Sequence, residues 1–300
     1  MPSLFTTTSI KTDISPKLTN GEKISIYYHN IFDYPLNFAD LIKWNTGDEL
    51  KIKSSKFKIQ SKSGFYFVEG KEGTIYKRKL NKRISQRKLI IAKKAADILS
   101  FIPTIKMIGI TGSLAMENSN EESDIDLMII TRSGSLWTSR LLAYLLIDAV
   151  EKLRLFGIQK RSPNDRNQKD KLCLNMWLDE NDLVWKKNDR NLYTAHEIAQ
   201  IVPLTNKDKT YEKFLLKNKW ILNYWPNSIE KKYIGNHISY IGKTKTQYTN
   251  PNILHTWLEN ICFQIQYRYM KSKISREVIT KTRALFHPQD WGKIVLERLA

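Results

Sequence analysis

Two aspartates separated by one residue, Asp124 and Asp126, open an apolar run that ends at Ile130. In a β-strand, alternate side chains project from the same face, and a rise of about 3.3 Å per residue places their Cα atoms about 6–7 Å apart. Two carboxylates at that spacing can bind one hard divalent cation or share two. The pattern therefore predicts a metal site on a strand.

A glycine–serine pair, Gly112-Ser113, precedes the aspartates and follows a second apolar run, Ile105 to Ile110. That run is long enough for one buried strand. Glycine allows the backbone to turn sharply or to approach a ligand closely, so we expect Gly112 to end the strand beside a ligand.

This combination resembles the polymerase beta-like nucleotidyltransferase superfamily, whose signature is a strand, Gly-Ser, a spacer and Asp-x-Asp on the next strand. The resemblance implies an α+β fold with a mixed sheet flanked by helices. It also implies that Gly112 and Ser113 hold the triphosphate of an NTP, and that Asp124 and Asp126 bind Mg²⁺. The expected reaction is transfer of a nucleoside monophosphate to an unknown acceptor.

Asp-x-Asp has two other interpretations. The motif can be a solvated strand end. It can also begin an EF-hand loop, but Leu127-Met128-Ile129 stand where that loop needs ligands and a glycine.

Members of the superfamily usually carry a third carboxylate on a further strand, often as the base for the attacking hydroxyl. We expect that strand at Leu172 to Leu178, where the polar residue in the middle is Asn175 and Asp179 comes only at the end. With Asn175 in this position the site binds metal and nucleotide but lacks a strong base. With Asp179 reaching in, the catalytic set is complete. The sequence leaves both arrangements open.

The hydrophobic patterning predicts four regions: a disordered lead-in at 1–20, a small domain at 21–83, the nucleotidyltransferase domain at 84–200 and a helical C-terminal region at 201–300. In the small domain, Asn37 is expected to cap a helix, and 65–68 is expected to form a hairpin with 74–76. Further helices are predicted at 84–99, 136–156, 191–200, 211–225, 251–271 and 276–286.

The small domain resembles a winged helix-turn-helix domain, which implies contact with DNA or RNA through a helix and the hairpin. Packing on the catalytic domain or on a partner protein is the alternative.

The formal net charge of the chain is +19, and residues 51–100 contain fifteen Lys or Arg against three acidic residues, or 15 − 3 = +12. A basic segment suits a polyanion, although a Lys-rich composition alone would also scatter lysines over solvated faces. A second hypothesis is therefore a nucleic-acid-binding regulator with a degenerate nucleotide-binding domain.

Several other residues have less specific signals. Cys173 and Cys262 have no metal-like spacing and are interpreted as buried thiols in a reducing cytoplasm. Glu197 follows His196 without the second histidine of a zinc helix, so a helix surface or a structural hydrogen bond is expected. Residues 1–17 show no signal-peptide core, and the apolar stretch at 141–147 is far shorter than the ~18 residues of a membrane span.

Overall fold

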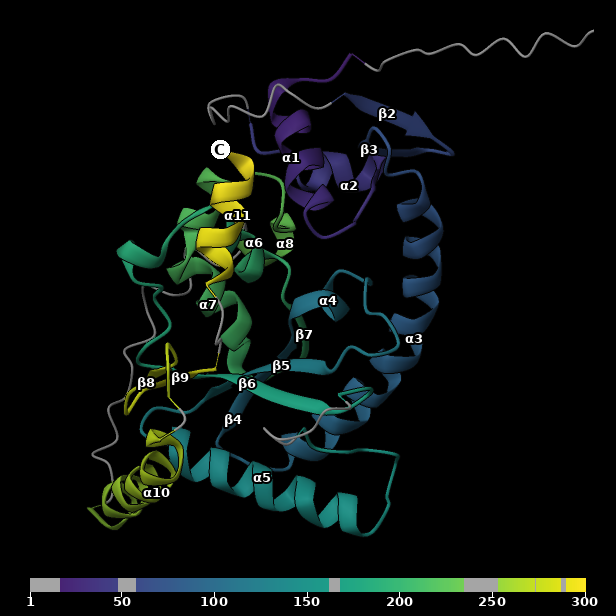
Figure 1. The fold of residues 1–300 in the computed structure, drawn as a ribbon. Coiled ribbons are helices and arrows are strands. Elements are labelled where there is room, and N and C mark those ends of the chain that lie inside the picture. Colours follow the sequence, from purple (N-terminus) through teal and green to yellow (C-terminus); the bar gives the residue numbers. More distant parts are fainter. Residues whose placement is uncertain (1–16, 48–57, 162–167, 235–252, 273, 287–289) are drawn as a thin grey trace, which may run out of the picture.

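A six-stranded mixed sheet lies at the centre of the computed structural model, which describes residues 17–47, 58–161, 168–234, 253–272, 274–286 and 290–300 (Figure 1). The strand order is β7-β4-β5-β6-β9-β8, with β5 and β6 parallel and every other pair antiparallel. The strands are β4 (Ile105–Ile110), β5 (Ile125–Thr131), β6 (Leu172–Asp179), β7 (Val202–Asn206), β8 (Val278–Ile279) and β9 (Arg283–Leu285). The predicted α+β fold, with a mixed sheet flanked by helices, is confirmed.

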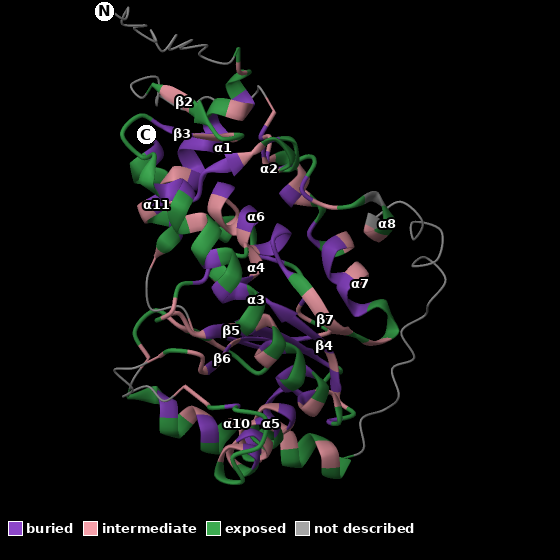
Figure 2. Cartoon of the chain, turned by 90° about the vertical axis from the view of Figure 1, so that its right-hand side faces the viewer, coloured by how far each residue is buried: buried purple, intermediate pink, exposed green. Residues whose placement is uncertain are grey.

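The two faces of the sheet are covered by different helices because side chains alternate along β5. Ile125, Leu127 and Ile129 are buried on the face that carries α3 (Gly73–Ser100), α5 (Leu136–Lys152) and α10 (Ile253–Lys271). Met128 and Ile130 are buried on the opposite face, under α6 (Leu192–Ala199), α7 (Thr210–Lys217) and α11 (Trp291–Leu299). The sheet strands form the most buried layer of the molecule (Figure 2).

The N-terminal elements are α1 (Asn20–Asn30), β1 (Leu36–Asn37), α2 (Phe38–Lys43), β2 (Ile59–Lys62) and β3 (Phe65–Val68). Asn37 caps α2 as predicted, and it forms a capping box with Asp40. The predicted hairpin partner was wrong, because β3 pairs with β2 and not with 74–76. Ser63 and Gly64 make the turn at φ 52° and 78°, the positive angles that a two-residue hairpin turn requires.

Residues 74–76 instead belong to the first turn of α3, a helix of 28 residues. The expected domain boundary at 83/84 therefore falls inside a continuous helix. Tyr28 and Trp44 from the N-terminal elements share one hydrophobic core with Ile198 and Trp225. The four-region division and the winged-helix resemblance stay predictions, and residues 1–16 of the expected lead-in lie outside the described residues.

The C-terminal region is less helical than predicted, since β7, β8 and β9 all join the central sheet. The helix predicted at 276–286 was wrong. The segment forms β8 and β9, and β9 supplies backbone hydrogen bonds to β6. Buried Arg283 fixes this strand through Asp182 and the carbonyl of Val184. Tertiary pairing thus overrides the local helical pattern.

Within the described ranges, the remaining short elements are α4 (Gly112–Ala115), α8 (Lys231–Ile234) and three 3₁₀ helices at Lys187–Asp189, Lys207–Lys209 and Lys219–Asn223. Among the described residues, no helix has the length and apolar character needed to cross a membrane.

Candidate active site

The glycine–serine pair and the aspartates meet where β4 ends and β5 begins. The backbone N–H of Thr111 donates to the carbonyl of Asp126 at 3.1 Å, and α4 starts at the next residue. Gly112 has φ +61°, and a Cβ at this position would lie 2.8 Å from Oδ2 of Asp126. A side chain is therefore excluded by conformation and by space. The structure brings Gly112 and Asp126 into direct proximity.

Ser113 is tied into the loop that leads from α4 to β5. Its hydroxyl is hydrogen-bonded to the Ser119 hydroxyl at 3.0 Å, and its carbonyl accepts from the Asn118 N–H at 2.8 Å. The Ser119 N–H in turn donates to the Ser85 hydroxyl of α3. This loop is held by a helix that precedes the motif in the sequence.

Lys88 of α3 fixes the same loop and also the entry to β6. Its side chain is fully buried, and Nζ donates to the carbonyls of Ser123 at 2.6 Å and of Glu121 at 3.2 Å. It also forms an ion pair with Asp170 at 2.9 Å. Because Ser123 precedes β5 and Asp170 precedes β6, one lysine aligns the beginnings of both parallel strands.

A β-bulge in β6 places Asn175 against Asp126. Asp126 pairs with Cys173, and Met128 pairs with Met176, so β6 has one extra residue in this interval. The Asn175 Nδ2–H donates to Oδ1 of Asp126 at 2.6 Å. Oδ1 of Asn175 is buried and accepts no hydrogen bond from the described residues. An orphan acceptor of this kind indicates a place for a ligand or a cation.

Asp179 lies at the far end of the same strand. It pairs with Thr131, five residues along β5 from Asp126, which is about 16 Å of strand. Its carboxylate accepts from the N–H groups of Gly134 at 2.6 Å and Asn181 at 2.8 Å. Burial raises its pKa to about 6 against the opposing effect of these backbone donors. The structure therefore brings Asn175, and not Asp179, to the aspartate pair.

Cys173 is a site residue that the sequence interpretation missed. A ligand atom from each of Asp124, Asp126 and Cys173 lies within 4.8 Å of the other two. Nη1 of Arg161 donates to Oδ2 of Asp124 at 2.5 Å and lies 3.5 Å from the Cys173 sulfur. Cys173 stands two residues before Asn175 in the same strand. This spacing was the only sequence signal that Cys173 and Asn175 lie on the same face of the sheet.

The electrostatics of the pair suit a divalent cation. Burial and, secondly, the neighbouring charge of Asp124 raise the pKa of Asp126 to about 7. Two carboxylates that oppose each other's ionisation are stabilised by a cation between them. With two carboxylates and the orphan amide oxygen of Asn175, the donor set fits a hard divalent ion.

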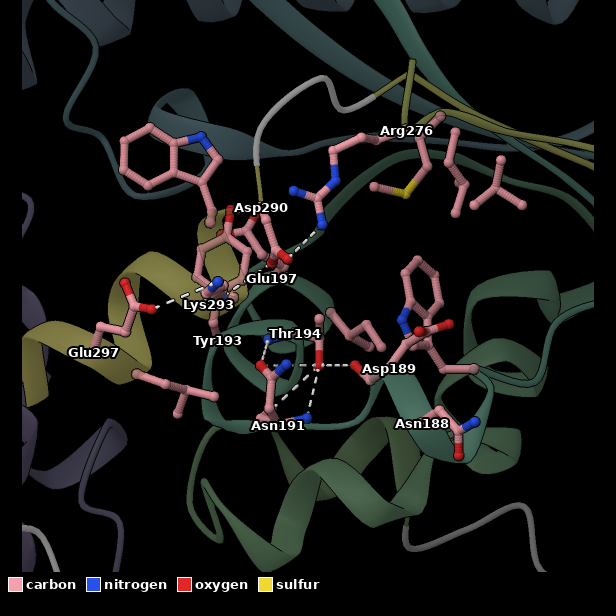
Figure 3. A pocket seen from close by; sticks show the side chains of 18 of the residues that line it. Asn188, Asp189, Asn191, Tyr193, Thr194, Glu197, Arg276, Asp290, Lys293 and Glu297 are labelled. Carbon is pink, nitrogen blue, oxygen red and sulfur yellow. Dashed lines mark hydrogen bonds and ion pairs between the residues drawn. The ribbon is translucent and has the colours of Figure 1, made fainter. Parts of the chain in front are cut away.

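Another carboxylate, that of Glu197 on α6, lies on the sheet face that carries Met128 and Ile130. Glu197 lies in the wall of a pocket of about 530 Å³, close to Tyr193, Asp290 and Lys293 (Figure 3). Burial and, secondly, the charge of Asp126 raise the pKa of Glu197 to about 8. The Gln200 side chain donates to Oε1 of Glu197 at 2.7 Å. The structural hydrogen bond expected at this helix position is present, and Glu197 in addition lines the pocket and is affected by the charge of Asp126.

Two side chains near the start of α5 are engaged in packing and hydrogen bonds. Trp137 of α5 is fully buried and donates from Nε1 to the carbonyls of Thr280 and Lys281. Arg140 donates to Gln266 of α10 at 2.6 Å. Both lie on α5, which follows the opposite end of β5 from Asp124.

The family model of the nucleotidyltransferase domain matches residues 92–171. The matched segment contains Gly112, Ser113, Asp124 and Asp126, and it ends just before β6. The comparisons with curated proteins and with solved structures give no match. A nucleotidyltransferase domain is therefore supported for this part of the chain, and the acceptor is not identified by any relative.

Proposed function

We propose that the protein transfers a nucleoside monophosphate from an NTP to a hydroxyl-bearing acceptor, with release of pyrophosphate. The observation that carries this proposal is the close approach of Gly112 to Asp126 within the segment that matches the nucleotidyltransferase domain. The backbone at Gly112 is free of a side chain, and a phosphate can therefore approach it closely. Ser113 is the adjoining hydroxyl for the triphosphate.

Asp124, Asp126 and Asn175 are proposed to hold the divalent cation, with Mg²⁺ as the ion of first choice. When bound, this cation neutralises phosphate charge and favours ionisation of the attacking hydroxyl. Asn175 donates to Asp126 and so fixes the orientation of that carboxylate. The buried pair supplies positioning and charge, which are the main requirements of phosphoryl and nucleotidyl transfer.

Glu197 is proposed as the base that accepts the proton of the acceptor hydroxyl. A carboxylate with a pKa near the working pH is well suited to general-base catalysis. The pocket beside it offers space for the acceptor, and Asp126 lies close enough to influence its charge. Asp179 has no part in this proposal, because its carboxylate is engaged at the other end of β6.

The test uses purified protein, Mg²⁺, cell extract and each NTP labelled either at the α- or at the γ-phosphate. Nucleotidyl transfer places the α-label on the acceptor, whereas phosphoryl transfer places the γ-label there. Asp126→Asn should abolish transfer, and Glu197→Gln should lower kcat by about 10²–10⁴-fold. Asp97→Asn, on an exposed face of α3, is the matched control. Full activity of Asp126→Asn would falsify the proposal.

Nucleic acid is proposed as one possible acceptor class, with the N-terminal elements and α3 as the binding surface. Several basic residues of this segment are already paired: Lys77 with Asp33, Arg78 with Asp40 and Arg87 with Glu121. Their contribution to polyanion binding is reduced accordingly. The regulator hypothesis requires binding without turnover, and filter binding at two salt concentrations tests it, since phosphate contacts make affinity fall steeply with salt.

The proposal also covers which residues form the catalytic unit and where in the cell the protein acts. We place the catalytic unit at residues 84–200, with β8, β9 and α11 from the C-terminal region closing the pocket beside it. A cytoplasmic setting agrees with an NTP substrate. Limited proteolysis, followed by activity measurements on the fragments, tests whether residues 21–83 are separable from the catalytic unit.

A further inference from the structure

The proposed metal site contains a sulfur atom as well as oxygen atoms. The thiol of Cys173 and the carboxylates of Asp124 and Asp126 each place one ligand atom within 4.8 Å of the other two. Such a spacing allows all three atoms to contact one ion. The parallel register of β5 and β6, which sets Asp126 directly beside Cys173, creates the arrangement.

Two further observations concern the charge and the free donor atoms at this position. Nη1 of Arg161 contacts both Oδ2 of Asp124 and the Cys173 sulfur, so a positive charge already bridges a carboxylate and the thiol. Oδ1 of Asn175 is buried, and none of the described residues donates a hydrogen bond to it. It belongs to the amide that contacts Asp126, and it offers a fourth donor atom beside the other three.

We propose that Cys173 is a ligand of this site and that it allows borderline divalent cations, such as Zn²⁺ or Co²⁺, to compete with Mg²⁺ for it. The inference rests on the proposed metal role of Asp124 and Asp126. Thiolate ligands favour such ions, whereas Mg²⁺ is bound by oxygen. On binding, the thiol transfers its proton to solvent and the sulfur forms the bond to the ion, with no redox change.

The consequence is that zinc-like ions compete with Mg²⁺ for one position and are released more slowly. A site with Asp in place of Cys173 would have three hard ligands and would not discriminate in this way. The second cysteine of the chain, Cys262, lies buried on α10 and packs within the core on the other face of the sheet. It supplies a matched control for any effect of removing a thiol.

The experiment titrates the full-length protein with Co²⁺ and follows the thiolate-to-cobalt charge-transfer absorption, while calorimetry measures Co²⁺ and Mg²⁺ affinities. The wild type and Cys262→Ser should show the band, and Cys173→Ser should lose it together with at least about tenfold in Co²⁺ affinity. Cys173→Asp should lose the band and bind Mg²⁺ more tightly than the wild type. Thermal melting in the absence of metal checks that each variant is folded.

The failures are distinguishable. Co²⁺ binding that needs Asp126 but gives no thiolate band overturns the role of Cys173 and leaves the proposed nucleotidyltransferase site intact. Absence of both Co²⁺ and Mg²⁺ binding to the wild type overturns the inference and the proposed metal site together. Equal Co²⁺ affinity in the wild type and in folded Cys173→Ser also overturns the inference.

Discussion

Gly112 and Asp126 are in such close contact that a single methyl group does not fit between them. A Cβ built on Gly112 would lie 2.8 Å from Oδ2 of Asp126, and the φ angle of Gly112 is +61°. The glycine–serine half and the aspartate half of the motif, although separated in the sequence by a short helix and a loop, are therefore in van der Waals contact. Because Gly112 has no side chain, a ligand of the aspartates can approach its backbone closely.

Gly112→Ala should therefore damage both stability and metal binding. The left-handed conformation alone costs about 1–2 kcal/mol for a residue with a Cβ. The clash with Asp126 adds to this and displaces the carboxylate. Gly134→Ala is the matched control, because Gly134 has φ +67° but no atom within 4 Å of its ideal Cβ. Urea unfolding should show destabilisation of both variants, with the larger loss in Gly112→Ala, and calorimetric Mg²⁺ titration should show weaker binding only in Gly112→Ala.

Asp126→Asn should stabilise the metal-free protein at neutral and higher pH. The folded state raises the pKa of Asp126 to about 7, above the unfolded value near 4, so it retains a proton that the unfolded chain releases. The wild type therefore loses stability, on the order of a few kcal/mol, as the pH rises from about 4 to about 7. The variant lacks this loss. Melting curves between pH 5 and 8 measure the difference, and Mg²⁺ should stabilise only the wild type.

Lys88→Met should loosen the start of both catalytic strands. The substitution keeps the length of the side chain but leaves the carbonyls of Ser123 and Glu121 and the carboxylate of Asp170 without their buried donor. Loss of one partner of a buried ion pair costs about 3 kcal/mol. Denaturation with urea checks the stability. Exposed Lys93→Met on the same helix should behave like the wild type, and similar losses in both variants would contradict the role of Lys88.

The His29–His196 pair should make the protein sensitive to mild acid. The Nε2 atoms lie 3.1 Å apart in a cage of Tyr28, Trp44 and Trp225. His29 Nδ1 faces the carbonyl of Ser25 at 2.8 Å and must donate, so His196 carries the proton between the two rings. Burial lowers the pKa of His29 to about 4 and that of His196 well below its usual value.

Stability should consequently fall as the pH decreases from about 6.5 to about 4, because the unfolded histidines bind protons in this range and the folded ones do not. Unfolding by urea at pH 7 and pH 5 measures the loss. The double variant His29→Phe/His196→Phe should show a smaller loss. His255→Gln, on half-exposed α10, should keep the pH dependence of the wild type. If the double variant loses as much stability between pH 7 and pH 5 as the wild type, the acid sensitivity arises from other groups.

The sequence by itself determined the local features of this protein. Short apolar runs indicated β4, β5 and β6, and the residue types around Gly112 and Asp126 predicted the part of the chain that matches a nucleotidyltransferase domain. Asn37 was identified as a helix cap from its own neighbourhood. These features depend on backbone preferences and side-chain periods within a few residues, which a single sequence contains.

The tertiary structure decided which distant residues lie near the aspartate pair. Cys173 stands beside Asp126 because β5 and β6 pair in parallel with a bulge, and Glu197 enters because α6 covers the same face. The sequence left open whether Asn175 or Asp179 approaches the aspartates for the same reason, since the distance of each from Asp126 depends on strand register and not on residue type. Register and face-to-face packing arise from contacts between segments far apart in the chain, and local periodicity does not encode them.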